Sequence, residues 1–198
     1  SIFVEFDHLN VTKFNGLQSV FLGRFENLTP YIQEMRLLKS TDEITKMLVA
    51  GVYADYAVKV GFDNIRAGRQ EMDLVAQIEF DLKNKGLSQL SFDTLVLTGE
   101  NAANPHGIPG KNPIENNALL LFDLGVVCEG YTSDMTRTVA VGRPDPFQED
   151  IYKLCLEAQL TAQDFIKPGV TASEVDAAAR KVHDKAGSGQ SYNQRQCN

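Results

Sequence analysis

Apolar and polar residues follow two different periods along the chain, and the change of period suggests a boundary. Residues 1 to 29 alternate in short strand-like segments, with a turn signal at Asn15-Gly16. From Tyr31 onward the apolar residues recur at helical spacing. We therefore predict that residues 1–35 are the tail of an amino-terminal domain plus a linker. Because the chain starts on Ser within a strand-like pattern, we expect a fragment of a longer protein.

Four helices are expected after the boundary, each with its own start or stop signal. Ser40 and Glu43 form a capping box for the first, and Thr171 and Glu174 form one for the last. Gly86 and Gly187 are placed to end two of them. The expected ranges are 41–60, 70–85, 148–166 and 173–186. In the first two, the apolar positions that set the helical period are Ile44, Met47, Leu48, Val52, Tyr56, Val60, Met72, Val75, Ile78 and Leu82.

Three strands are expected between the second and third helices, over residues 94–98, 118–128 and 131–141. A short Glu129-Gly130 turn joins the last two, which implies antiparallel pairing. Helices outside a largely antiparallel sheet predict an α+β layer architecture for the domain at residues 36–198.

Composition excludes several classes of function. The 198-residue chain has a formal charge of -7 and no dense run of basic residues, which argues against nucleic-acid binding. Its hydrophobic fraction is 43%, but no apolar run approaches the ~20 residues that span a bilayer. Its three cysteines are widely spaced and odd in number, which favours free thiols in a reducing compartment. We therefore expect a cytoplasmic protein with no nucleic-acid or membrane partner.

The strongest chemical signal is a pair of carboxylates, Asp123 and Asp134, on the two strands joined by the Glu129-Gly130 turn. Antiparallel pairing brings Asp123 opposite or diagonal to the neighbourhood of Asp134, and two such carboxylates suit a hard or borderline divalent cation. A carboxylate among leucines and Phe122 is costly to bury unpaired. The alternative, that Asp123 pairs with Arg137 or a lysine while Asp134 caps a turn, stays open on spacing alone.

His106 is the second candidate. It lies in a segment of small residues, 99–107, directly after a strand, where a fold presents reactive side chains. A histidine there can polarise a carbonyl or stabilise an oxyanion, or it can be a solvated loop residue. His183 is expected on a solvated helix face, and His8 is given no role. The weaker candidates, all on the last expected strand, are Tyr131, Thr136, Arg137 and Thr138.

Three ordered motifs match a known family. The runs Asn101-Ala102-Ala103-Asn104-Pro105-His106-Gly107, Leu121-Phe122-Asp123-Leu124-Gly125 and Gly130-Tyr131-x-Ser133-Asp134-Met135-Thr136-Arg137-Thr138 resemble the pita-bread metallopeptidases. These include Xaa-Pro aminopeptidases and prolidases, and they are related to methionine aminopeptidase and creatinase. The likeness covers about residues 36 to 187, and it is the order and spacing of the motifs that make it specific.

The resemblance implies a pita-bread fold, with a curved antiparallel sheet and outer helices, and a site for two divalent metal ions (Mn, Co or Zn). Asp123 and Asp134 match the two aspartate ligands, and His106 matches the histidine that contacts the substrate. The implied reaction is hydrolysis of the bond before proline by a metal-activated hydroxide. The expected substrates are short peptides with proline at the second position, and we expect a homodimer. A methionine aminopeptidase and a non-catalytic peptide- or protein-binding module are the alternatives.

The carboxyl-terminal end departs from the family pattern. The family's third ligand is a histidine, and the tail Arg195-Gln196-Cys197-Asn198 aligns with Asn198 in its place. The two glutamate ligands have no counterpart in the remaining sequence. We therefore expect the carboxyl-terminal half of the fold, and with it the metal site, to be incomplete in this chain. We also expect exposed apolar surface and self-association of the isolated chain.

Overall fold

The computed structural model describes residues 1–104 and 106–187, and it is α+β as the sequence predicts. It divides into two compact units, Ser1–Thr45 and Lys46–Asn198, which are described separately. The tail Arg195-Gln196-Cys197-Asn198 lies outside the described residues, so its alignment stays a prediction.

The first unit contains a β-α-β arrangement followed by a helix. Strands β1 (Ile2–Val4) and β2 (Phe25–Asn27) pair in parallel, α1 (Val11–Val20) connects them, and α2 (Thr29–Leu37) follows. The prediction that this region contains only strand-like segments was wrong. Helix α1 forms instead, and it contains Asn15-Gly16, where a turn was predicted. The Asn10 side chain caps this helix by accepting from the backbone N–H of Lys13 at 2.9 Å.

Aromatic packing explains why α1 forms despite two weak helix formers. The Phe14 ring meets the rings of Phe6 and Phe25 edge to face, with centroids 5.7 and 5.2 Å apart. This packing outweighs the low helix propensity of Asn15 and Gly16.

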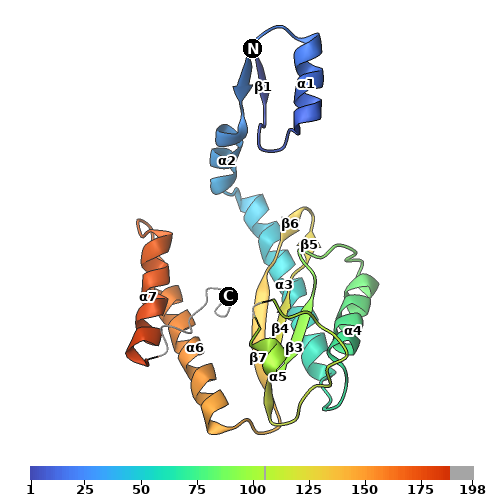
Figure 1. Cartoon of the computed structure of the whole chain (residues 1–198), viewed down its shortest axis with the longest axis vertical. Coiled ribbons are helices and arrows are strands. Elements are labelled where there is room, and N and C mark those ends of the chain that lie inside the picture. Colours follow the sequence, from blue (N-terminus) through green and yellow to red (C-terminus); the bar gives the residue numbers. More distant parts are fainter. Residues whose placement is uncertain (105, 188–198) are drawn as a thin grey trace. The chain divides into compact units, whose positions relative to one another are not determined.

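The second unit is built on a three-stranded antiparallel sheet in the order β3-β4-β7 (Figure 1). The strands are β3 (Leu95–Thr98), β4 (Ala118–Leu124) and β7 (Met135–Val141). Side chains of β4 alternate strictly between a buried face and a half-exposed face. Asp123 belongs to the half-exposed face, while the buried face carries Ala118, Leu120, Phe122 and Leu124.

The core lies between the buried face of β4 and two helices, α3 (Thr41–Asp63) and α4 (Glu71–Asn84). The part of α3 in this unit contributes mainly small side chains, and most of the larger apolar residues used to predict the helix are exposed. At Gly61 an added Cβ would meet the Phe122 ring at 2.6 Å, so the small residues allow the helix to approach the sheet closely. On α4, Met72 is 45% exposed, and Glu71 takes the buried position instead.

Helix ends follow the predicted signals. The Ser40 backbone N–H donates to the Glu43 carboxylate at 2.7 Å, which confirms the first capping box, and the Thr171 box is present as well. At the end of α4 the N–H groups of Gly86 and Leu87 donate to the carbonyls of Lys83 and Leu82, a Schellman motif with Gly86 at φ +86°.

The long predicted strands 118–128 and 131–141 are each interrupted. Gly125 and Val126 separate β4 from β5 (Val127–Cys128), and Ser133-Asp134 separates β6 (Tyr131–Thr132) from β7. The Glu129-Gly130 turn is confirmed; both residues have positive φ, 50° and 83°, as a two-residue type I′ hairpin requires.

Two antiparallel helices, α6 (Pro146–Phe165) and α7 (Ala172–Lys185), follow the sheet and pack on each other (Figure 1). The prediction that His183 lies on a solvated face was wrong, because its side chain is 5% exposed. The charged neighbours that suggested solvent, such as Lys181 and Asp184, point to other faces of the helix, since adjacent helical residues are about 100° apart. Within the described ranges, no helix has the length and apolar character required to cross a bilayer.

Candidate metal and catalytic site

Asp123 lies near the end of the central strand, β4. Its pairing partners are Leu95 on β3 and Thr136 on β7, so the carboxylate has a strand on either side. The Thr136 hydroxyl donates to Asp123 Oδ1 at 3.0 Å. Asp123 is thus held on the half-exposed face of the sheet, in a fixed register with β7.

Asp134 lies two residues before Thr136, directly ahead of β7. Because Thr136 is opposite Asp123, Asp134 occupies the diagonal position, at which side chains of an antiparallel pair still interact. Arg137 pairs with Phe122, is exposed, and donates to the Thr136 carbonyl at 2.8 Å. The structure thus gives Asp123 the Thr136 hydroxyl as its partner, and the alternative that it pairs with Arg137 was wrong.

Electrostatics supports an interaction between the two aspartates. Burial raises the pKa of the Asp123 carboxyl above its ordinary value, the Thr136 hydrogen bond opposes this rise, and the negative charge of Asp134 adds to it. A bound cation would offset both the burial and the repulsion. The two side chains therefore fit as carboxylate ligands of a divalent metal ion.

This pKa shift predicts how the stability of the metal-free chain depends on pH. The folded state holds the Asp123 proton more tightly than the unfolded state, so the contribution of this one group to stability is largest at low pH and is lost as pH rises from about 3.8 through the raised pKa. Asp123→Asn removes this loss and still accepts from Thr136. In urea titrations with a chelator present, we expect the variant to gain stability over the parent at pH 7 and to gain less at pH 4.

A matched control separates this effect from a general change of charge. Asp93→Asn removes an exposed carboxylate two residues before β3. We expect no comparable gain at pH 7. Equal gains from both substitutions would mean that net charge, rather than the environment of Asp123, sets the pH dependence.

A small set of hydrogen bonds holds Ser133, and with it Asp134, at the break between β6 and β7. The Ser91 hydroxyl donates to the Ser133 carbonyl at 2.8 Å, and the Val126 N–H donates to the Ser133 hydroxyl at 3.1 Å. Gly125 lies beneath them, where a Cβ would overlap the Ser133 carbonyl oxygen and the Ser91 hydroxyl. A glycine is therefore required here for the chain to bring Asp134 beside β4.

Gly125→Ala is expected to destabilise the chain by about 1–3 kcal/mol, because the backbone of Ser133 must shift to admit the methyl group. Urea denaturation measures the change. Gly51→Ala is the control, since a Cβ at Gly51 in α3 meets nothing within 4 Å. There we expect a gain of about 0.5–1 kcal/mol from helix propensity. An unchanged midpoint for Gly125→Ala would show that the site tolerates the methyl group.

His106 follows the helical turn α5 (Gly99–Ala102) that continues from β3. This helical turn was not predicted within the 99–107 segment. The imidazole is on an exposed residue, and the His106 backbone N–H donates to Asn104 Oδ1 at 3.0 Å. The next residue, Gly107, is buried, and a Cβ there would meet the Asn101 carbonyl at 2.6 Å. His106 is therefore presented on a tightly packed loop.

Glu71 is a site neighbour that sequence reasoning missed. Its side chain is fully buried at the start of α4 and accepts hydrogen bonds from four groups of the segment 98–112, which contains His106. A usable signal was present in the sequence. Glu71 precedes Leu74, Val75 and Ile78 by three, four and seven residues, which places it on the buried face of the helix.

The described residues supply two carboxylates to the candidate metal site. No group of three or more His, Cys, Asp or Glu side chains that could hold a metal ion occurs among residues 1–104 and 106–187. Asn198, aligned with the family's third ligand, is not among the described residues. The arrangement around β4 therefore matches two ligands of the larger set that the motifs imply.

Comparison with known proteins agrees with this geometry. A family model described as Metallopeptidase family M24 matches residues 45–196, which is most of the chain. The chain belongs to this family. Its relatives include an Xaa-Pro dipeptidase of Lactobacillus helveticus, 44% identical over 192 residues, and an uncharacterized peptidase of Staphylococcus aureus, 38% identical over 192 residues. These alignments cover 96% of this chain and 52% and 55% of the relatives, so the chain spans about half their length.

Solved structures of similar proteins have the same fold. The prolidase from Pyrococcus horikoshii aligns with a TM-score of 0.91 at 34% identity, over 97% of this chain and 55% of that one. An X-Pro aminopeptidase from Thermotoga maritima aligns with a TM-score of 0.90 at 29% identity, over 96% and 54%. The predicted pita-bread fold is confirmed, and this chain corresponds to about half of each of those structures.

Proposed function

We propose that this chain is part of a metal-dependent Xaa-Pro dipeptidase or aminopeptidase that hydrolyses the peptide bond before proline. The observation that carries the proposal is the register of β4 and β7, which sets Asp134 diagonal to Asp123 on one face of the sheet. The names of the relatives, Xaa-Pro dipeptidase and prolidase, support proline at the second position of the substrate.

In this proposal each residue has a separate task. Asp123 and Asp134 hold divalent metal, with Mn, Co and Zn as the candidates, and the hydroxyl of Thr136 keeps Asp123 oriented. A metal ion held there would supply an activated water and would polarise the scissile carbonyl. His106 contacts the substrate and donates a hydrogen bond to the oxyanion that forms at that carbonyl.

The remaining features of the proposal concern the whole protein. Residues 1–35 would be the tail of an amino-terminal domain plus a linker, and residues 36–198 part of the catalytic domain; the family match from residue 45 supports this division. The proposal includes a cytoplasmic location, which the cysteine usage favours. A homodimer stays a prediction.

The test is hydrolysis by the purified full-length gene product supplied with Mn²⁺ or Co²⁺. We expect release of the first residue from Xaa-Pro dipeptides or Xaa-Pro-Yaa peptides and little turnover of Met-Ala peptides. Cleavage of Met-Ala peptides alone would favour a methionine aminopeptidase. Metal binding without turnover of either substrate would favour a non-catalytic binding module.

A further inference from the structure

A single buried carboxylate connects helix α4 to the loop that carries His106. Glu71 Oε1 accepts from the Thr98 backbone N–H at 2.8 Å, and Glu71 Oε2 accepts from the Gly110 backbone N–H at 3.0 Å. These two donors stand at opposite ends of the segment between β3 and residue 110. The carboxylate therefore fastens both ends of the loop to the same point.

Two asparagines complete the set of partners. The Asn101 side-chain amide donates to both Glu71 oxygens, at 3.1 and 3.0 Å, and the Asn112 amide donates to Oε2 at 3.1 Å. The Asn101 amide also donates to the Ile108 carbonyl at 3.1 Å, two residues beyond His106. Every hydrogen-bond partner of the Glu71 side chain is thus a donor, which suits a side chain with two acceptor oxygens at the amino-terminal end of a helix.

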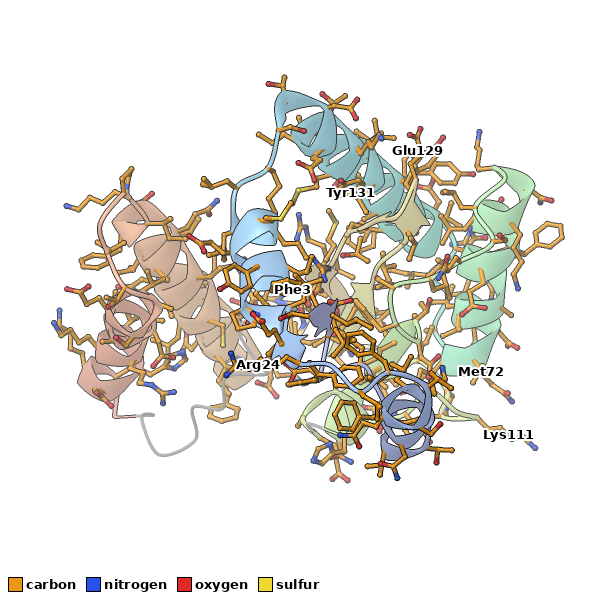
Figure 2. All side chains as sticks on the ribbon, turned by 90° about the horizontal axis from the view of Figure 1, so that it is seen from above. Phe3, Arg24, Met72, Lys111, Glu129 and Tyr131 are labelled. Carbon is orange, nitrogen blue, oxygen red and sulfur yellow. The ribbon has the colours of Figure 1, made fainter. Side chains whose placement is uncertain are left out.

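The backbone beside Glu71 adds to the same connection. The N–H groups of Glu71 and Met72 donate to the carbonyls of Asn112 and Gly110, at 3.0 and 3.1 Å. Figure 2 labels Met72 and Lys111 at this edge of the unit. Because main chain and carboxylate act together, the loop is held to α4 by contacts that involve none of the proposed metal ligands.

We propose that Glu71 is a positioning residue for His106, whose carboxylate fixes the 98–112 loop so that the imidazole is held at the substrate. This inference rests on the proposed function for its catalytic part. A carboxylate does what an amide cannot at this position, since both oxygens must accept. Glu71→Gln keeps the shape but turns an NH2 group toward N–H donors and leaves at least one of them unpaired.

The first arm of the test needs no activity. The chain has three histidines, so NMR with histidine labelling can follow His106 against His8 and His183. In Glu71→Gln we expect the His106 signals to shift or broaden while those of His8 stay in place, and the amides of Thr98 and Gly110 to exchange at least ~10-fold faster than in the parent. Unchanged His106 signals and unchanged exchange would overturn the proposal.

The second arm uses a double-mutant cycle in the full-length gene product. Glu71→Gln is expected to lower kcat by about 10–100-fold with little change in KM, and to have almost no further effect in a His106→Ala background. The same fold loss in both backgrounds would mean that Glu71 acts on stability alone, and the proposal would fall. If the parent cleaves no Xaa-Pro peptide, the proposed function fails, while the NMR arm still decides whether Glu71 fixes the loop.

Two further variants keep the result interpretable. Asn101→Ala removes the link between Glu71 and the Ile108 carbonyl without removing the buried carboxylate, so it serves if Glu71→Gln does not fold. We expect it to shift the His106 signals in the same direction. Glu79→Gln, on the same helix two turns later, is the matched control and should leave the His106 signals and kcat unchanged.

Discussion

Asp134→Asn is expected to remove metal-dependent stabilisation and to lower hydrolysis of Xaa-Pro peptides by at least about 100-fold in the full-length gene product. Replacing even a partner behind a metal ligand costs about 10–100-fold in metal affinity or activity, and Asp134 is proposed as a ligand itself. At a free Mn²⁺ concentration of 100 times the dissociation constant, the unsubstituted protein should gain about 2.7 kcal/mol in its free energy of unfolding. Thermal unfolding with and without Mn²⁺ measures this gain, which the variant should lack.

The control for this substitution is Asp93→Asn, which changes the net charge equally but lies outside the aspartate pair. It should keep both the Mn²⁺ stabilisation and the activity. Full Mn²⁺ stabilisation in Asp134→Asn would place the metal away from β4 and contradict the assignment of both aspartates.

His106→Ala is expected to lower kcat by about 10²–10³-fold, the loss seen when one donor to a developing oxyanion is removed. Its KM should change little, because the proposed hydrogen bond strengthens as charge develops on the carbonyl oxygen. Metal-dependent stabilisation should be retained, which separates this variant from Asp134→Asn. Steady-state kinetics with an Xaa-Pro substrate gives both constants.

His8→Ala is the matched control, since His8 is an exposed histidine in the first unit with no proposed role. Its kinetics should equal those of the parent. A rise in KM with unchanged kcat for His106→Ala would assign His106 to substrate binding in the ground state alone.

The sheet and the aspartate pair were predictable because their signals are local. An apolar run with a single carboxylate marks β4, and Glu129-Gly130 is short enough to force antiparallel pairing, so the neighbourhood of Asp123 and Asp134 follows from counting along the chain. The capping boxes at Ser40 and Thr171 are local in the same sense. Each of these features involves residues close together in sequence.

The interruptions at Gly125 and Ser133 were missed because their cause is not local. They depend on Ser91, whose hydroxyl reaches the Ser133 carbonyl across 42 positions of sequence. The 131–141 segment alone reads as one continuous strand. Helix α1 was missed for a similar reason, because contacts of Phe14 with the distant rings of Phe6 and Phe25 support it.

Glu71 was missed because its partners are 27 to 41 residues away and lie on a loop without periodicity. On sequence grounds it is one of two acidic residues in the first turn of a helix, where acidic side chains are common. Glu71 differs from Asp73 in its position around the helix, since it lies on the same face as Leu74 and Ile78. That position predicts burial, whereas the identity of the partners requires the fold.

Because burial alternates along β4, substitutions at neighbouring positions of this one strand have different effects. Substitutions at Ala118, Leu120, Phe122 and Leu124 act on the core, whereas those at Leu119, Leu121 and Asp123 act on the opposite face. An engineer who wishes to alter the proposed metal site can therefore vary Leu119 and Leu121 beside Asp123 and leave the helix-facing half unchanged. A library restricted in this way would sample new ligand chemistry while most of its members still fold.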